Sequence, residues 1–363
     1  MDDNSLLEWL VTNSGPALKL RMLNKSMIEK DTFPVDELVD QLLEIEKVKN
    51  SLSYFDAFRN YKTMACRELW ALVHNCYENC FEQFMPFLLD IGFRKGITVF
   101  DEKVEIMRKV YPYLMDTYPF HGIIIMLNLL RAGYCYEDIT YYVTDRVDQL
   151  HIAAIKQAFD IYEKDKGKVR QPSKWKDFLI LKDEYVTETQ LPVIYDVELI
   201  LFFIKYIENA DVEKKVYDII AYINDPRYQS LAGDYGWHWA EGAKTYHASS
   251  SGIHLPLYNK SELTGSQQYH FLNLLDRMSY SEAMCKAKWF HNCIEYLEQY
   301  KTERNTYLLP EELIHPSKMN TFYSLYVSKE ALKSVKRNEK KSFALELYST
   351  FYVLLIKHRM KQV

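Results

Sequence analysis

Turn-forming residues are scarce in this chain, and their scarcity limits the folds open to it. The 363 residues include only 11 glycines and 11 prolines. A β-sandwich or β-barrel of this length needs many tight turns, whereas long helices with short connections need few. Hydrophobic residues make up 48% of the chain and aromatic residues 15%, which is enough apolar surface for a folded interior. We therefore expect a folded, almost wholly helical protein.

Apolar residues recur with helical spacing along most of the chain. The pattern predicts helices over residues 35–48, 64–77, 80–91, 103–115, 122–132, 137–150, 152–164, 212–223, 267–278, 282–300 and 342–360. Pro16 and Pro34 stand where a helix can begin, and Gly133 stands where a helix end favours glycine. Short connections imply antiparallel neighbours, so the predicted fold class is all-α, built as a stack of antiparallel helical hairpins.

Two stretches interrupt the helical pattern and suggest how the chain is divided. Residues 164–176 are polar and contain Gly167 and Pro172, and residues 224–265 form a connection of unusual length. The prediction is N-terminal hairpins over residues 1–163, a linker over 164–190 and C-terminal hairpins over 191–363. The last part includes an aromatic loop at 224–265, and the whole chain forms one continuous unit.

Charge and segment composition exclude several classes of protein. With 45 basic and 50 acidic residues the net charge is −5, which gives nucleic-acid binding little support. The acidic N-terminus lacks the pattern of a signal peptide, and the longest apolar run, residues 194–207, contains Asp196, Glu198 and Lys205. We expect a cytoplasmic protein with reduced thiols, without a membrane span, nucleic-acid partner or cofactor.

One segment carries a resemblance to a known superfamily. Residues 225–239, DPRYQSLAGDYGWHW, contain Gln229, Gly233, Gly236 and Trp237. This spacing resembles the Gln…Gly-x-Trp turn between inner and outer helices of the terpenoid-cyclase and prenyltransferase toroids. Residues 9–23, WLVTNSGPALKLRML, and 191–203, LPVIYDVELILFF, also resemble bacterial proteins grouped with that superfamily. The resemblance implies an α/α-toroid-like stack in which the Gln caps a helix end and the Trp stacks nearby.

The catalytic motifs of that superfamily are missing from the chain. It has no DxDD motif, and its nearest approach, Asp145-Arg-Val-Asp148, has the wrong spacing. Neither the Asp-x-Cys of the zinc-dependent prenyltransferases nor a DDxxD motif for magnesium diphosphate occurs. The resemblance therefore implies a fold without its known reactions.

The aromatic loop is the richest source of candidate ligand-binding residues. Aromatic walls with a few polar groups suit a small-molecule pocket, and a histidine near Ser or Tyr can carry a proton. The candidates are Tyr235, Trp237, Trp239, Lys244, Tyr246, His247 and His254. The alternative is a loop whose aromatic residues close the end of the helical stack.

Tyr195 and Asp196 form a second candidate, at the start of the most apolar predicted helix. A carboxylate in the first helical turn usually accepts hydrogen bonds from exposed backbone amides. The alternative interpretation places Asp196 at the rim of a central cavity, bonded to a tyrosine or to a ligand.

Cysteine and histidine spacing gives a metal site little support. Two groups were considered: His74 with Cys76 and Cys80, and Cys285 with His291 and Cys293. Structural zinc sites typically pair cysteines in loops, whereas these thiols fall on predicted helices. We predict buried core thiols and no metal.

Three functions stay open after these exclusions. The first is a binding protein or enzyme for a hydrophobic or aromatic small molecule in a central cavity, as the toroid resemblance implies. The second is a non-catalytic helical scaffold that presents a groove to a protein partner. The third is a polysaccharide-active α/α toroid, for which the sequence shows no pair of catalytic acids. No motif decides whether the protein is an enzyme.

Overall fold

A computed structural model describes residues 3–75, 77–163, 180–187, 191–231, 238–241, 244–247, 252–258, 262–263, 265–314 and 325–362. Within these ranges the regular secondary structure is helical, apart from one two-stranded hairpin and isolated bridges. The all-α fold class predicted from the scarcity of turn residues is confirmed.

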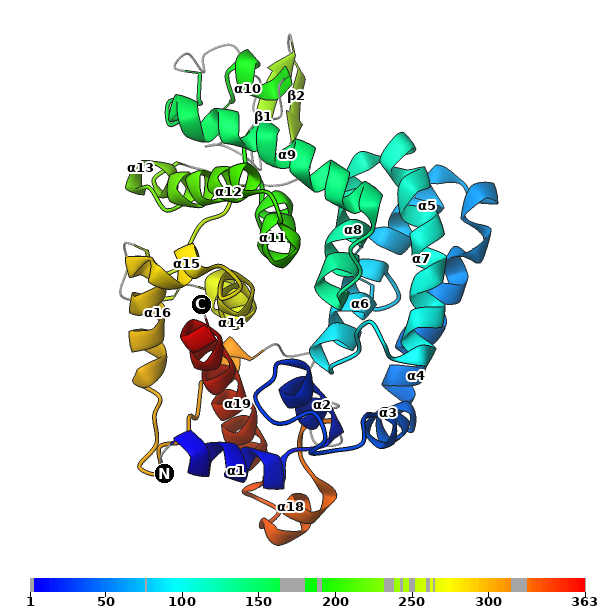
Figure 1. The fold of residues 1–363 in the computed structure, drawn as a ribbon, viewed down its shortest axis with the longest axis vertical. Coiled ribbons are helices and arrows are strands. Elements are labelled where there is room, and N and C mark those ends of the chain that lie inside the picture. Colours follow the sequence, from blue (N-terminus) through cyan, green and yellow to red (C-terminus); the bar gives the residue numbers. More distant parts are fainter. Residues whose placement is uncertain are drawn as a thin grey trace.

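The N-terminal elements run from the bottom of Figure 1 up its right-hand side. They are α1 (Asp3–Asn13), α2 (Pro16–Asn24), α3 (Val35–Leu43), α4 (Glu46–Ser53), η1 (Tyr54–Thr63), α5 (Cys66–Val73), α6 (Phe81–Asp90), α7 (Thr98–Thr117), α8 (Pro119–Ala132) and α9 (Glu137–Lys156). Pro16 opens α2, and Gly133, with a φ of 96°, ends α8 as predicted.

The remaining elements continue across the top of Figure 1 and down its left-hand side. They are α10 (Asp183–Thr187), α11 (Ile194–Phe203), η2 (Ile204–Tyr206), α12 (Ala210–Ile223), α13 (Pro226–Gln229), β1 (His238–Glu241), β2 (Lys244–His247), α14 (Gly265–Met278), α15 (Glu282–Lys286), α16 (Lys288–Glu298), η3 (Glu311–Leu313), α18 (Lys329–Ser334) and α19 (Lys340–Gln362). None of these or the preceding helices has the length and apolar character needed to cross a membrane.

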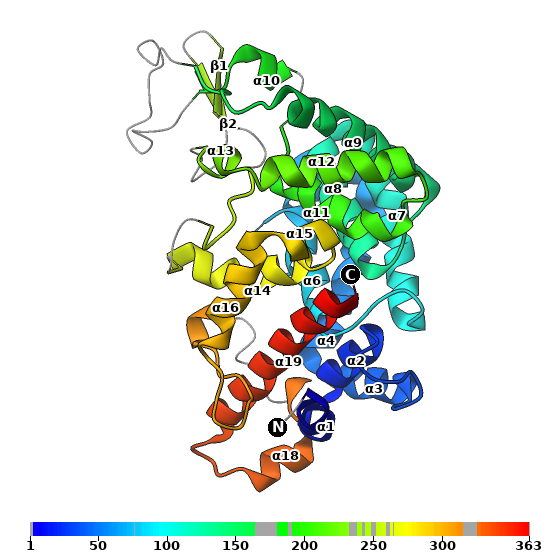
Figure 2. The same cartoon turned by 60° about the vertical axis from the view of Figure 1, so that its left-hand side comes forward.

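The two ends of the chain meet, and Figures 1 and 2 both show α1 beside α19 and α18. Ser14 pairs with Val327 in an antiparallel bridge. The Gly15 N–H donates to the Tyr326 carbonyl (2.9 Å), and the Ser328 N–H donates to the Asn13 carbonyl (2.8 Å). A Cβ at Gly15 would lie 2.8 Å from the Leu325 carbonyl oxygen, so this junction accepts only glycine without a shift of the backbone.

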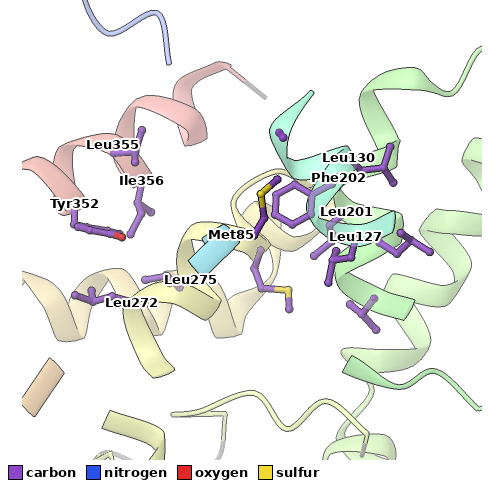
Figure 3. Close-up of a cluster of buried hydrophobic side chains, with 14 of the residues drawn as sticks. Met85, Leu127, Leu130, Leu201, Phe202, Leu272, Leu275, Tyr352, Leu355 and Ile356 are labelled. Carbon is purple, nitrogen blue, oxygen red and sulfur yellow. The ribbon is translucent and has the colours of Figure 1, made fainter. Parts of the chain in front are cut away.

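The middle of the molecule is a packed apolar core, shown in Figure 3. Helices α6, α8, α11, α14 and α19 supply its buried side chains, and α11 and the middle of α19 are buried on all sides. The labelled members are Met85, Leu127, Leu130, Leu201, Phe202, Leu272, Leu275, Tyr352, Leu355 and Ile356. This core holds the C-terminal parts of several helices in fixed positions relative to one another.

Several predicted helix boundaries were wrong. Residues 137–150 and 152–164 were predicted as two helices, but one helix, α9, continues to Lys156 because no Gly or Pro interrupts the chain near His151. Gln157, with a φ of 48°, ends it. Conversely, the segment 282–300 divides into α15 and α16 at Ala287, whose backbone is extended.

The two predicted breaks contain structure of their own. In the linker, Leu181 forms a bridge with Tyr162 and is followed by α10, while residues 164–179 and 188–190 lie outside the described ranges. The aromatic loop contains α13 and the β1–β2 hairpin, neither of which was predicted. The predicted division into residues 1–163, 164–190 and 191–363 stays a prediction.

Candidate functional site

Asp196 is buried at the start of α11 and engaged by protein groups. Its carboxylate accepts two hydrogen bonds from the Arg146 guanidinium of α9, at 2.9 Å from Nε and 2.8 Å from Nη2. It also accepts the Val193 N–H at 3.2 Å, which confirms the predicted capping role. Arg146 supplies the charge that a buried carboxylate requires. A ligand contact by Asp196 stays a prediction.

The side chain of Tyr195 contacts other residues than that of Asp196 does, so Tyr195 and Asp196 do not form one site. Its hydroxyl donates to Glu82 Oε1 of α6 at 2.5 Å, and its ring meets Phe120 edge-on, with centroids 5.4 Å apart. Burial and the Glu82 carboxylate raise the pKa of Tyr195. The second carboxylate oxygen of Glu82 contacts His74 Nδ1, which links Tyr195 to a histidine on the surface.

A histidine and aromatic cluster surrounds this Glu82 contact. We name it the His74 cluster; it comprises Trp70, His74, Glu82, Phe120, His121 and Tyr195. The rings of His74 and His121 lie 6.3 Å apart between centroids. The hydrogen bond to Glu82 raises the pKa of His74, whereas burial lowers the pKa of His121. Neither histidine was among the predicted ligand-binding residues.

The structure describes some of the candidate residues of the aromatic loop in full, others by their backbone alone, and leaves two outside the described ranges. Tyr235 and Trp237 lie outside the described residues. For Trp239, Lys244, Tyr246 and His247 only the backbone course is described. The ladder sets Trp239 opposite Tyr246, Glu241 opposite Lys244, and His238 opposite His247. His254 is half-buried between Ile253 and Leu255, both of which bond to the α13 segment.

Gln229 makes the capping contact that the toroid resemblance implies. Its Nε2 donates to the Ile223 carbonyl, at the end of α12, at 2.8 Å, and to the Ile253 carbonyl at 3.1 Å. Its Oε1 accepts the Leu255 N–H at 2.8 Å. One side chain thus ties α12 to the segment that carries His254. The predicted stacking partner, Trp237, lies outside the described residues, so the resemblance itself stays a prediction.

A cavity of about 300 Å³ beside the apolar core was not predicted. It lies where α2, α6, α8, α11 with η2, and α14 end, and Phe202 belongs to both the core and the cavity wall. Six basic side chains and two acidic ones line it; they are Arg21, Lys25, Arg94, Lys95, Arg131 and Lys205, with Asp90 and Asp276. We call this cavity the basic pocket.

The position of the basic residues follows from the helix ends. The last turn of a helix leaves carbonyl groups without intrahelical partners and carries a partial negative charge, which favours nearby cations. Arg94 Nη1 accordingly donates to the carbonyl of Asn24, the last residue of α2, at 2.9 Å. Arg131 lies in the last turn of α8, and Lys205 lies in η2, the short helix that follows α11. The basic residues of the pocket could therefore be seen in the sequence at predicted helix ends. Each of them, however, is sufficiently explained by the partial negative charge of its own helix end.

Exposure falls from the mouth of the basic pocket to its base. Arg94, Lys95 and Lys205 are exposed, Lys25 and Arg131 are half-buried, and Arg21 retains only 4% of its accessible surface. The Arg21 guanidinium lies 4.7 Å and 4.8 Å from the ring centroids of Phe351 and Tyr352 in α19. Among the described residues, nothing accepts a hydrogen bond from its Nη1.

Arg21 stays charged despite its burial. Burial alone would lower its pKa, but Tyr352, Asp90 and Asp276 together raise it. Both acidic residues of the pocket are also engaged by other arginines. Asp90 pairs with Arg131 (3.3 Å), and Asp276 pairs with Arg359 of α19 (2.6 Å). A buried cation with an unused donor is costly, so the base of the pocket is suited to an additional anion.

Tyr280 places a phenol oxygen in the wall of the same pocket. Lys25 Nζ contacts this oxygen, and Arg359 Nη2 lies 3.1 Å from it. The Arg359 guanidinium lies over the ring, 4.1 Å from its centroid. Burial would raise the pKa of Tyr280, but Arg359 and Lys25 outweigh burial and lower it to about 8. Burial also lowers the pKa of Lys25.

Comparison with protein-family models, curated proteins and solved structures gives no match. In the described part of the chain no group of three or more His, Cys, Asp or Glu side chains is placed to hold a metal ion. Cys80, Cys285 and Cys293 are buried thiols, as predicted, whereas Cys66 is exposed and Cys135 is half-buried; Cys76 lies outside the described residues. The basic pocket is thus the best-defined candidate site.

Proposed function

We propose that the protein binds a small anionic molecule in the basic pocket, with the charged group of the ligand directed towards Arg21 and Lys25. The observation that carries the proposal is the buried Arg21, a residue of the pocket wall whose guanidinium Nη1 has no hydrogen-bond acceptor among the described residues. Ligand cavities begin at about 300 Å³, so the volume suits a small metabolite.

The charge along the pocket supports entry of an anion. Exposed Arg94, Lys95 and Lys205 at the mouth attract an anion from solution, and the half-buried Lys25 leads towards Arg21. Arg21 lies in the last turn of α2 and Lys25 is the C-cap of that helix, so both basic residues reach the pocket from the same helix end. Two positive charges in the wall of one pocket repel each other, and an anion bound beside them would offset that repulsion.

The other predicted functions remain separate proposals. Phe93, Phe202 and Tyr206 line the basic pocket, so an anionic ligand with an apolar part would also agree with the predicted hydrophobic or aromatic ligand. The toroid-like arrangement is supported by the circuit of helices that returns α19 to α1 (Figure 1). A protein scaffold and a polysaccharide-active toroid are not favoured by any particular contact.

The competing explanation is that the basic residues only neutralise helix ends. Calorimetric titration with inorganic phosphate, glycerol 3-phosphate and citrate separates the two, with uncharged glycerol as the negative control. We expect saturable binding of an anion that weakens as salt is added. A ligand at 100 times its dissociation constant should also add about 2.7 kcal/mol to the free energy of unfolding.

Variants locate the binding. Arg21→Met should weaken anion binding about 10- to 100-fold, because it removes a charged hydrogen-bond donor worth about 1.5–3 kcal/mol. Lys205→Gln, at the exposed mouth, should weaken binding about 2- to 5-fold. Lys336→Gln, whose side chain is 80% exposed and lies outside the pocket wall, is the matched control and should have no effect. Absence of anion binding to the unaltered protein, with variants that change only stability, would overturn the proposal.

A further inference from the structure

We infer that the anion is a phosphate-bearing compound whose phosphate is held by Arg21, Lys25 and the hydroxyl of Tyr280, so that binding requires Tyr280 to carry its proton. This inference rests on the proposed function and names the ligand class and the proton that accompanies it.

Three donors reach the basic pocket from two sides. Arg21 enters from the last turn of α2 and Lys25 from the C-cap of that helix, and Tyr280 enters from the segment after α14. A phosphate group offers three acceptor oxygens and a charge close to −2 near neutral pH. A carboxylate offers two oxygens and a single charge. A phosphate therefore matches both the number of donors and the excess of basic side chains better than a carboxylate does.

Tyr280 is surrounded by charged groups on every element that packs against it. Lys25, the C-cap of α2, contacts its oxygen, and Arg359 of α19 contacts its oxygen and its ring. Asp276 of α14 pairs with the same Arg359. Phe202 of α11 meets the ring edge-on, with centroids 4.9 Å apart, and contributes no charge. Two cations and one carboxylate thus act on a single phenol.

The phenolate and the ligand compete for the same cations. Burial raises the pKa of Tyr280, yet Arg359 and Lys25 lower it to about 8, so without a ligand the phenolate forms at mildly alkaline pH. A phosphate beside Lys25 adds negative charge next to that oxygen and favours its protonated form. Binding above pH 8 should therefore take up one proton per ligand, and affinity should fall as the pH rises.

Proton uptake is measured by calorimetric titration with glycerol 3-phosphate in two buffers of different ionisation enthalpy. Between about pH 8.5 and 9.5 we expect uptake approaching one proton and a fall in affinity approaching 10-fold per pH unit. The phosphate itself adds no pH dependence there, since its second pKa is about 6. Glycerate, which carries one carboxylate and a single charge, should bind more weakly than glycerol 3-phosphate.

Deprotonation of Lys25 would mimic part of this behaviour, so a signal specific to tyrosine is needed. The near-ultraviolet absorbance of tyrosinate, recorded at about pH 8.5, should fall when glycerol 3-phosphate is added. Tyr280→Phe should abolish that change and the proton uptake, and should weaken binding several-fold at neutral pH. Tyr141→Phe is the matched control, because Tyr141 is 78% exposed and outside the pocket wall.

The outcomes distinguish this inference from the function on which it rests. If phosphate compounds bind without a tyrosinate change or proton uptake, the role of Tyr280 is overturned and the proposed function stands. If glycerate binds as tightly as glycerol 3-phosphate, the assignment to phosphate is overturned. If no anion binds at all, the proposed function fails as well.

Discussion

Glu82 shows how a single carboxylate can connect distant parts of this chain. It sits on α6 and joins the His74 imidazole, which is about half-exposed, to the Tyr195 hydroxyl at the start of α11. Its negative charge stabilises the protonated form of His74 and disfavours ionisation of Tyr195. The pKa values of His74 and Tyr195 therefore depend on a residue of another helix and not on their neighbours in the sequence.

Glu82→Gln should lower the pKa of His74, because the amide keeps a hydrogen-bond acceptor but removes the charge. A histidine whose pKa is raised by folding contributes stability below about pH 6.5, and that contribution disappears as the pH rises through the raised value. The variant should therefore lose more stability at pH 5.5 than at pH 9. NMR titration of the ring protons measures the pKa, and His151, which bonds Asp218 instead, serves as the internal control. An unchanged His74 titration would contradict this account.

At the scale of elements, α11 is an apolar helix held by two buried ion pairs. Asp196 pairs with Arg146 of α9, and Glu198 pairs with Arg277 of α14. Both carboxylates are buried, with exposed fractions of 1% and 4%. A helix that is apolar all round can pack in several orientations about its own axis. Ion pairs with two different neighbouring helices fix one of these orientations. We interpret these pairs as the reason that α11 ends beside the basic pocket.

Asp196→Asn should destabilise the protein by about 3–5 kcal/mol, because it leaves the Arg146 charge buried without its partner. The double variant Asp196→Leu with Arg146→Met should recover most of that loss, since it removes both charges. Urea unfolding measures each free energy. A stable Asp196→Asn variant that had lost ligand binding would instead support the alternative interpretation, in which Asp196 contacts the ligand.

At the scale of the whole molecule, the junction of the two chain ends closes the fold. The Gly15 N–H and the Asn13 carbonyl bond to residues more than three hundred positions later in the chain. Gly15 has an ordinary φ of −77°, so it is the close approach of the 325–327 backbone that requires glycine here.

Gly15→Ala should cost about 1–3 kcal/mol of unfolding free energy, because the methyl group would force the two backbones apart. Gly265→Ala is the matched control: a Cβ there meets no atom within 4 Å, and the residue begins α14. That substitution should be neutral or slightly stabilising. Hydrogen exchange at residues 325–328 should show whether the junction opens in Gly15→Ala; equal stability of the two variants would contradict the close-packing argument.

Features that depend on neighbouring residues could be predicted from the sequence, whereas features that depend on tertiary packing could not. Residues within one helical turn of each other determine four features that were predicted. These are the helical class, the start of a helix at Pro16, the end of a helix at Gly133 and the capping contact of Asp196. The basic pocket does not, because its basic residues lie between positions 21 and 205, on segments that only tertiary packing brings together. Each basic residue at a helix end has a sufficient local explanation. The anion binding that we propose depends on which helix ends lie side by side in the folded protein.

The closing contact between the chain ends also has a consequence for biosynthesis. Ribosomes add about 5–20 residues per second, so the partners of Asn13 and Gly15 emerge on the order of tens of seconds after α1 and α2. The apolar residues of α1 that pack towards α19 stay uncovered during that interval. Until the residues of α18 and α19 have left the ribosome, α1 therefore lacks the surface that covers it in the folded protein.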